Sequence, residues 1–150
     1  MRLIAPGVAV ALLVTIGAVE ASVSADQLLT RSTRPRLEAA GVLLTAGGLL
    51  ASTVIYLVLG HIAANDSVAI RAGVLTGAFA GLIGGTVRAV IISEVVAGLV
   101  SSYAAVPDWF VPAALGVFVA LSCAVSAVGG GAIAWTGRRL SRALRSRRPV

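Results

Sequence analysis

The sequence predicts an all-α integral membrane protein, a bundle of four transmembrane helices. Two observations support this prediction, an unusually apolar composition and four long apolar stretches joined by short polar connections. Hydrophobic residues make up 58% of the chain and charged residues 12%, whereas a soluble domain has roughly 45–50% apolar and about 25% charged residues. This excess of apolar side chains indicates that lipid is the solvent for most of the chain.

Each apolar stretch is long enough to cross a hydrocarbon core of about 30 Å, for which a helix needs about 20 residues. Backbone amides in lipid must be satisfied within their own segment, so these stretches are predicted to be helices. The predicted spans are residues 3–24, 37–59, 72–93 and 110–136, followed by a basic cytoplasmic tail at 138–150. Asn65-Asp66-Ser67, between the second and third spans, is a turn and a good N-cap for the third helix. Because no repeat or low-complexity linker divides residues 1–150, we expect a single membrane domain.

The first stretch has an alternative interpretation as a secretory signal peptide. Arg2 provides a basic start, and Val23-Ser24-Ala25 resembles a small-residue cleavage site. Cleavage of residues 1–25 would leave three helices. The apolar run at residues 3–19 is longer than the 7–15 residues usual for a signal peptide, which favours a retained helix.

The distribution of arginine predicts the orientation. With four spans, both termini and the second connection share one side, and eight arginines lie there against three in the first connection. The positive-inside rule therefore predicts that both ends are cytoplasmic (N-in and C-in). The three arginines of the first connection count against this orientation, because they would then lie outside. All basic side chains are Arg, and the Ala, Val and Gly bias is typical of GC-rich bacterial genomes. We therefore expect a multi-pass protein of a bacterial cytoplasmic (plasma) membrane.

The third span contains the most specific pattern, four glycines spaced four residues apart at Gly73, Gly77, Gly81 and Gly85. Residues at this spacing share one helical face, and glycines there allow another helix backbone to approach closely. Glycine is otherwise unfavourable in a helix by about 1 kcal/mol relative to alanine. The pattern predicts a helix-packing face, within the chain or between chains, and a narrow pore lining is the alternative. Small residues that could supply the partner face are Ser122, Ser126 and Gly130, or Gly47 and Ala51.

Arg88 is the charge of greatest interest, because it follows Gly85 by three residues and continues the glycine face. A cation at the centre of a membrane helix costs roughly 2.5–3.5 kcal/mol on insertion scales. One interpretation is that Arg88 reaches the interface or forms a structural ion pair. The other is that it lies on an ion or substrate path.

Glu20 and Glu94 are the acidic candidates for the same path. Both lie near predicted span ends, where an interfacial carboxylate is the simpler interpretation. Glu94 is six residues beyond Arg88, which places it about 240° around the helix and away from the Arg88 face. Arg88 and Glu20 both fall near the outer interface, and our hypothesis is that they contact each other from different helices.

The basic tail resembles a short amphipathic helix suited to anionic lipid headgroups. Determining the topology, or docking to a cytoplasmic partner, are alternative roles for it. Nucleic acid is not expected as a partner, because no aromatic or base-reading pattern accompanies the charge. The arginines concerned are Arg138, Arg139, Arg142, Arg145, Arg147 and Arg148.

No motif in the sequence names a reaction, so we expect no enzyme, cofactor or metal. Phosphate-loop, GxSxG and HExxH patterns do not occur. His61 and Cys123 are the sole histidine and cysteine, and they do not make a metal-ligand cluster.

Two functional hypotheses follow from these patterns. The leading one is a non-enzymatic subunit, assembly factor or scaffold that acts by helix–helix packing, as a homo-oligomer or with a membrane-protein partner. The alternative is a small oligomeric channel or transporter that uses Arg88 with Glu20 or Glu94. They differ in what Arg88→Gln should impair first, assembly for the former and transport for the latter.

Overall fold

The computed structural model describes residues 4–29, 35–103 and 107–146, which are helical apart from short turns at 63–65 and 107–109. The helices are α1 (Ile4–Leu29), α2 (Pro35–Ile62), α3 (Asp66–Tyr103) and α4 (Phe110–Ser146). All four are long and apolar enough to cross a membrane. The predicted all-α membrane fold is therefore confirmed. Arg2, Arg31, Arg34, Arg147 and Arg148 lie outside the described residues.

The helices extend beyond the predicted spans. α3 has 38 residues, or about 57 Å at 1.5 Å per residue, which exceeds the bilayer core. α4 continues to Ser146, so the tail from Arg138 onward prolongs the last helix instead of forming a separate one. Arg, Leu and Ala are good helix formers, and no proline occurs between Pro112 and Pro149 to end the helix.

Within the predicted turn at residues 65–67, Asn65 is the N-cap of α3. Its side-chain Oδ1 accepts a hydrogen bond from the backbone N–H of Val68 at 2.9 Å and another from the Ser67 hydroxyl at 2.9 Å. The cap satisfies an amide that has no partner within the helix. It thereby fixes the turn between α2 and α3.

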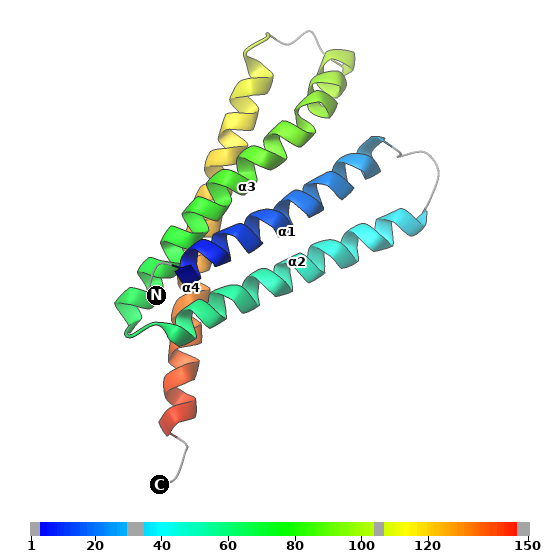
Figure 1. Ribbon diagram of the computed structural model, residues 1–150. Coiled ribbons are helices and arrows are strands. Elements are labelled where there is room, and N and C mark those ends of the chain that lie inside the picture. The colour runs from blue at the N-terminus through cyan, green and yellow to red at the C-terminus, as the bar shows by residue number, and fades with distance from the viewer. Residues whose placement is uncertain (1–3, 30–34, 104–106, 147–150) are drawn as a thin grey trace.

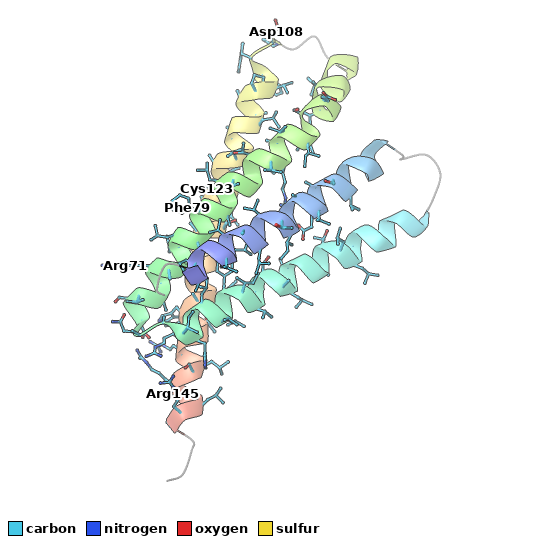
Figure 2. The ribbon with its side chains drawn as sticks, in the orientation of Figure 1. Arg71, Phe79, Asp108, Cys123 and Arg145 are labelled. Carbon is cyan, nitrogen blue, oxygen red and sulfur yellow. The ribbon has the colours of Figure 1, made fainter. Side chains whose placement is uncertain are left out.

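The four helices form two hairpins, α1–α2 and α3–α4, that diverge from one another along the molecule (Figure 1). We call the end with the α2–α3 turn the terminal end, because the N-terminus also lies there. The opposite end, where each hairpin is connected, we call the hairpin end. Figure 2 places Asp108 at the hairpin end, with Arg71 and Arg145 at or near the terminal end. The hairpins separate toward the hairpin end.

The most extensive contact in the bundle is between α3 and α4, and the glycine face of α3 lies within it. A Cβ atom on Gly77 would overlap the backbone carbonyl of Ser126, and one on Gly81 would lie 2.5 Å from the carbonyl oxygen of Ser122. The Cys123 thiol donates to the Ala78 carbonyl at 3.4 Å across the same contact. The two backbones therefore approach too closely for side chains at these glycines.

α4 meets α2 in the same way at the terminal end. A Cβ atom on Gly60 would overlap the Ala134 carbonyl, and one on Gly137 would lie 2.5 Å from the Leu57 carbonyl oxygen. These contacts, together with those of α3, close the bundle at its terminal end.

Polar contacts reinforce this closure. The Arg138 guanidinium donates to the Ala64 carbonyl at 2.5 Å, and Arg142 pairs with Asp66 at 2.7 Å. Because Arg142 is exposed, its ion pair contributes at most about 1 kcal/mol. The two arginines therefore mainly fix where α4 lies against the α2–α3 turn.

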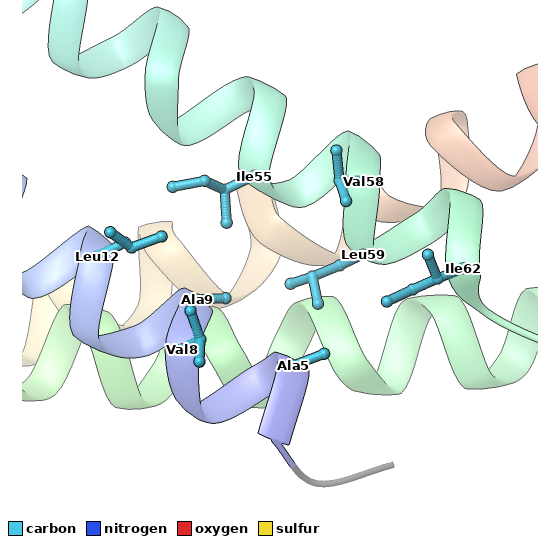
Figure 3. Close-up of a pocket in the computed structure, with 8 residues that line it drawn as sticks. All are labelled: Ala5, Val8, Ala9, Leu12, Ile55, Val58, Leu59 and Ile62. Carbon is cyan, nitrogen blue, oxygen red and sulfur yellow. The ribbon is translucent and has the colours of Figure 1, made fainter. Parts of the chain in front are cut away.

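α1 and α2 pack less closely, and an apolar groove of about 440 Å³ lies between them (Figure 3). Four residues of α1 face four of α2 across it. Its lining is aliphatic throughout, which suits a surface in contact with lipid acyl chains. The lining residues are Ala5, Val8, Ala9, Leu12, Ile55, Val58, Leu59 and Ile62.

We expect Gly77→Ala and Gly84→Ala to have opposite effects on stability. The methyl group at Gly77 would overlap α4 and should lower the free energy of unfolding by about 1–3 kcal/mol, as overpacking does. At Gly84 no neighbouring atom lies within 4 Å, so alanine should be neutral or stabilising, by up to about 1 kcal/mol. Thermal unfolding in detergent, followed by tryptophan fluorescence, measures both. Equal melting temperatures for the two variants would contradict the α3–α4 contact described here.

Candidate functional site

A cavity of about 430 Å³ lies between the two hairpins, and all four helices line it. We call it the inter-hairpin cavity. Its polar groups include Glu20 from α1, Tyr56 from α2, Arg88 from α3 and Ser126 from α4. The apolar groove of Figure 3 is of similar volume but has no such groups. Because polar side chains inside a membrane segment are costly, their convergence makes this cavity the candidate site.

The centre of the site is an ion pair between Arg88 and Glu20. The Arg88 Nη2 atom donates to the Glu20 carboxylate, and its Nε donates to the Gly17 carbonyl oxygen at 3.1 Å. The side chains of Arg88 and Glu20 are 37% and 16% exposed, respectively. The pair joins α3 to α1, and thus one hairpin to the other.

Glycines on two helices make room for this pair. A Cβ atom on Gly48 of α2 would overlap the Glu20 carboxylate, and one on Gly17 would lie 3.6 Å from the Arg88 guanidinium. α2 can therefore approach the carboxylate closely enough to enclose it. Gly84, one turn before Arg88, leaves open space in the cavity wall.

The pair lies deep along its helices and closer to the hairpin end. Arg88 is about 26 Å along α3 from Arg71, and Glu20 is about 24 Å along α1 from Ile4, at 1.5 Å per residue. Tyr56 is only about 9 Å from the last residue of α2, Ile62, at the terminal end. The cavity therefore runs from charged groups near the hairpin end to Tyr56 nearer the closed end.

Hydroxyl groups line the cavity along its length. α2 contributes Thr45, Ser52 and Tyr56, and α4 contributes Ser122 and Ser126. Tyr56 is only 6% exposed, and its ring packs over Gly130 of α4. Sequence reasoning missed the α2 residues, although their spacing of seven and four is a helical face and could have identified them.

The other predicted site residues lie elsewhere or have two roles. Glu94 is exposed and does not line the cavity. Gly73 and Gly77 face α4, whereas Gly81 and Gly85 lie at both the α4 contact and the cavity wall.

The arginines predicted to bind lipid headgroups also differ among themselves. Arg138 and Arg142 bind groups near the α2–α3 turn, and the Arg139 guanidinium lies 4.4 Å from the centre of the Trp135 ring. Arg145 is exposed at the end of α4. Of the described arginines in this set, Arg145 and Arg139 therefore remain the candidates for contact with headgroups.

The electrostatics of the site follow from its paired charges. Arg88 and Glu20 together carry no net charge, which reduces the cost of placing them in a low-dielectric environment. Removing one charge takes this ionic partner from the other, which is more unfavourable than replacing both. The site can therefore offer a cationic and an anionic group to a solute while staying neutral overall.

Two further findings bear on the chemistry. Among the described residues, no three His, Cys, Asp or Glu side chains come together as a group that could hold a metal ion. Comparisons of the chain with protein-family models, curated proteins and solved structures give no match. The cavity itself is therefore the basis for assigning a function.

We expect the stabilities of Glu20→Gln and Arg88→Gln to be strongly coupled. Each single variant should lower the free energy of unfolding by about 1–3 kcal/mol, because one charge loses its partner. The double variant should lose less than the sum, with a coupling of about 0.5–3 kcal/mol. Denaturant unfolding in detergent measures the three variants, and Glu94→Gln serves as the exposed control with little effect. Additive losses would show that the two side chains do not interact.

Proposed function

We propose that this protein is a small channel or transporter that takes a small polar solute into the inter-hairpin cavity and passes it across the membrane. The role is non-enzymatic, since the cavity groups hold and release the solute without a chemical step. The observation that carries the proposal is the Arg88–Glu20 pair in a cavity lined by all four helices. Ionisable groups in membrane helices commonly mark ion or substrate pathways.

The packing of the glycine face supports this proposal over a role in association through α3. Gly73, Gly77 and Gly81 are already covered by the backbone of α4 within one chain. A second protein could reach them only by displacing α4. The face that suggested helix–helix association between molecules is therefore occupied, whereas the cavity has space for a ligand.

The closure of the terminal end indicates from which side a solute would enter the inter-hairpin cavity. Close backbone contacts of α4 with α2 and α3 obstruct the cavity at the terminal end, and the hairpins separate at the other. With the N-in and C-in orientation expected from arginine distribution, the separated ends of the hairpins would face the outside, and we propose that the solute enters from that side. Passage to the cytoplasm then requires the hairpins to move relative to each other.

We expect Gly84→Leu to block passage and Gly98→Leu to leave it unchanged. A Cβ atom at either glycine of α3 would meet no neighbouring atom within 4 Å, but only Gly84 lines the cavity. Leucine at position 84 should fill the cavity without forcing the helices apart. The assay is uptake of radiolabelled glycine, acetate, methylammonium and acetamide by liposomes containing the purified chain. Melting temperatures of both variants check that they remain folded.

The outcomes of this assay are distinct. Uptake of any of the four solutes above that of protein-free liposomes, lost in Gly84→Leu and kept in Gly98→Leu, supports the proposal. Uptake that both variants retain places the path outside the cavity. No uptake of any solute by the folded wild-type protein counts against transport.

A subunit or assembly role is the second candidate, and a specific observation favours it. Gly47 of α2 is exposed, no neighbouring atom lies within 4 Å of a Cβ placed there, and Ala51 one turn later is also exposed. Small residues at this spacing allow close approach of another membrane helix. This face remains uncovered in a single chain.

If this face binds a partner, Gly47→Leu should abolish co-purification of that partner or of a second copy. Gentle extraction through a C-terminal tag, followed by mass spectrometry and native mass measurement, identifies what is bound. Gly116→Leu is the control, because Gly116 is also exposed with open space around it. A complex unaffected by Gly47→Leu would exclude this face as the interface.

A further inference from the structure

The charges in the inter-hairpin cavity also constrain which solute it can bind. Arg88 of α3 and Glu20 of α1 both line the cavity and lie in direct contact, so a solute meets a cation and an anion side by side. This inference rests on the proposed function and concerns the chemical class of its solute.

The net charge of the occupied site distinguishes anionic, cationic and zwitterionic solutes. A simple anion on Arg88 would displace or crowd Glu20 and leave the site with one excess negative charge. A simple cation on Glu20 would leave one excess positive charge. Because Glu20 is largely enclosed, at 16% exposed, excess charge beside the pair is unfavourable, and both classes of solute are disfavoured.

We propose that the inter-hairpin cavity binds a small zwitterion, whose carboxylate contacts the Arg88 guanidinium and whose ammonium contacts the Glu20 carboxylate. Such a solute replaces the ion pair with two new ion pairs and keeps the occupied site neutral. A guanidinium can bind a carboxylate through two parallel hydrogen bonds, which adds geometric preference to charge. An α-amino acid is the simplest solute with both groups at adjacent positions.

The rest of the cavity fits the remainder of such a molecule. Toward the closed end, the wall changes from charged groups to the hydroxyls of Ser52 and Ser126 and then to Tyr56 and Ile133. A volume of about 430 Å³ falls within the range of about 300–1,000 Å³ typical of small-molecule sites. A zwitterion with a short side chain can thus place its charged groups on the pair and its side chain deeper.

The test uses solutes that divide a zwitterion into its charged parts. Acetate is glycine without the ammonium, methylammonium is glycine without the carboxylate, and acetamide is an uncharged analogue. L-Leucine adds an apolar side chain for the deeper part of the cavity. Binding of each to the full chain in lipid nanodiscs is measured by calorimetry, and uptake by liposomes is measured in parallel.

We expect glycine or L-leucine to bind about 30-fold or more tightly than acetate, methylammonium or acetamide, as the loss of a charged partner predicts. Arg88→Gln and Glu20→Gln should each weaken zwitterion binding by a similar factor. They should also shift selectivity in opposite directions, since Arg88→Gln leaves an anionic site that favours methylammonium. Glu20→Gln leaves a cationic site that favours acetate.

Matched controls separate this role from a structural one. Arg71→Gln on α3 and Glu94→Gln remove the same charges from exposed positions outside the cavity, and both should bind zwitterions as the wild type does. Partial unfolding could reduce all binding, but it would not produce opposite selectivities. The double variant Glu20→Gln with Arg88→Gln should show no preference among the charged solutes.

Several results would overturn the inference. If neither glycine nor L-leucine binds more tightly than acetate and methylammonium, the site does not select zwitterions. Unchanged selectivity in both single variants would have the same meaning. Uptake of acetate or acetamide alone, blocked by Gly84→Leu, would reject the zwitterion while the transport proposal stands. Absence of all uptake, with zwitterion binding intact, would reject transport and leave a binding site.

Discussion

The close approach of α4 to both α3 and α2 is the contact on which the rest of this bundle depends. Carbonyl groups of α4 lie where side chains would be on Gly77 and Gly60, so α4 contacts two helices through backbone atoms. In lipid no hydrophobic driving force brings apolar helices together, and such packing supplies the association instead. Because the α2 contact is near the terminal end, α2 and α4 are free to separate farther along, and the cavity results.

The separation of the hairpins allows the Arg88–Glu20 ion pair to form between α3 and α1. Arg88 follows the glycine face of α3 at a level where the hairpins have begun to separate, so its side chain reaches α1 across the cavity. Gly48 lets α2 approach the Glu20 carboxylate, which completes the enclosure. A larger residue at position 48 would push α2 away. The same small residues that permit close packing therefore also create the site.

Much of this arrangement could be predicted from the sequence, for identifiable reasons. Apolar runs of about 20 residues indicate helices in lipid whatever their neighbours are. The Asn65 cap is a local feature, and the Arg88–Glu20 contact followed from two charges at similar depth. The pairing of α3 with α4 could not be chosen over association between molecules, because a glycine face is equally complementary to any small-residue helix. The contacts of Arg138 and Arg142 were also missed, since they depend on where α4 meets the α2–α3 turn.

The unequal closure of the two ends constrains how the proposed transport could proceed. At the terminal end the obstruction consists of backbone packed against backbone at Gly60 and Gly137, which side-chain rotation cannot remove. Opening that end requires α2 and α4 to separate, and the hairpins must then move as units, as in rocking motions of transporters. Arg88 and Glu20 belong to different hairpins, so a solute that inserts between them changes one of the contacts that join those units. In the proposed transport, this pair of side chains would therefore couple binding of the solute to movement of the hairpins.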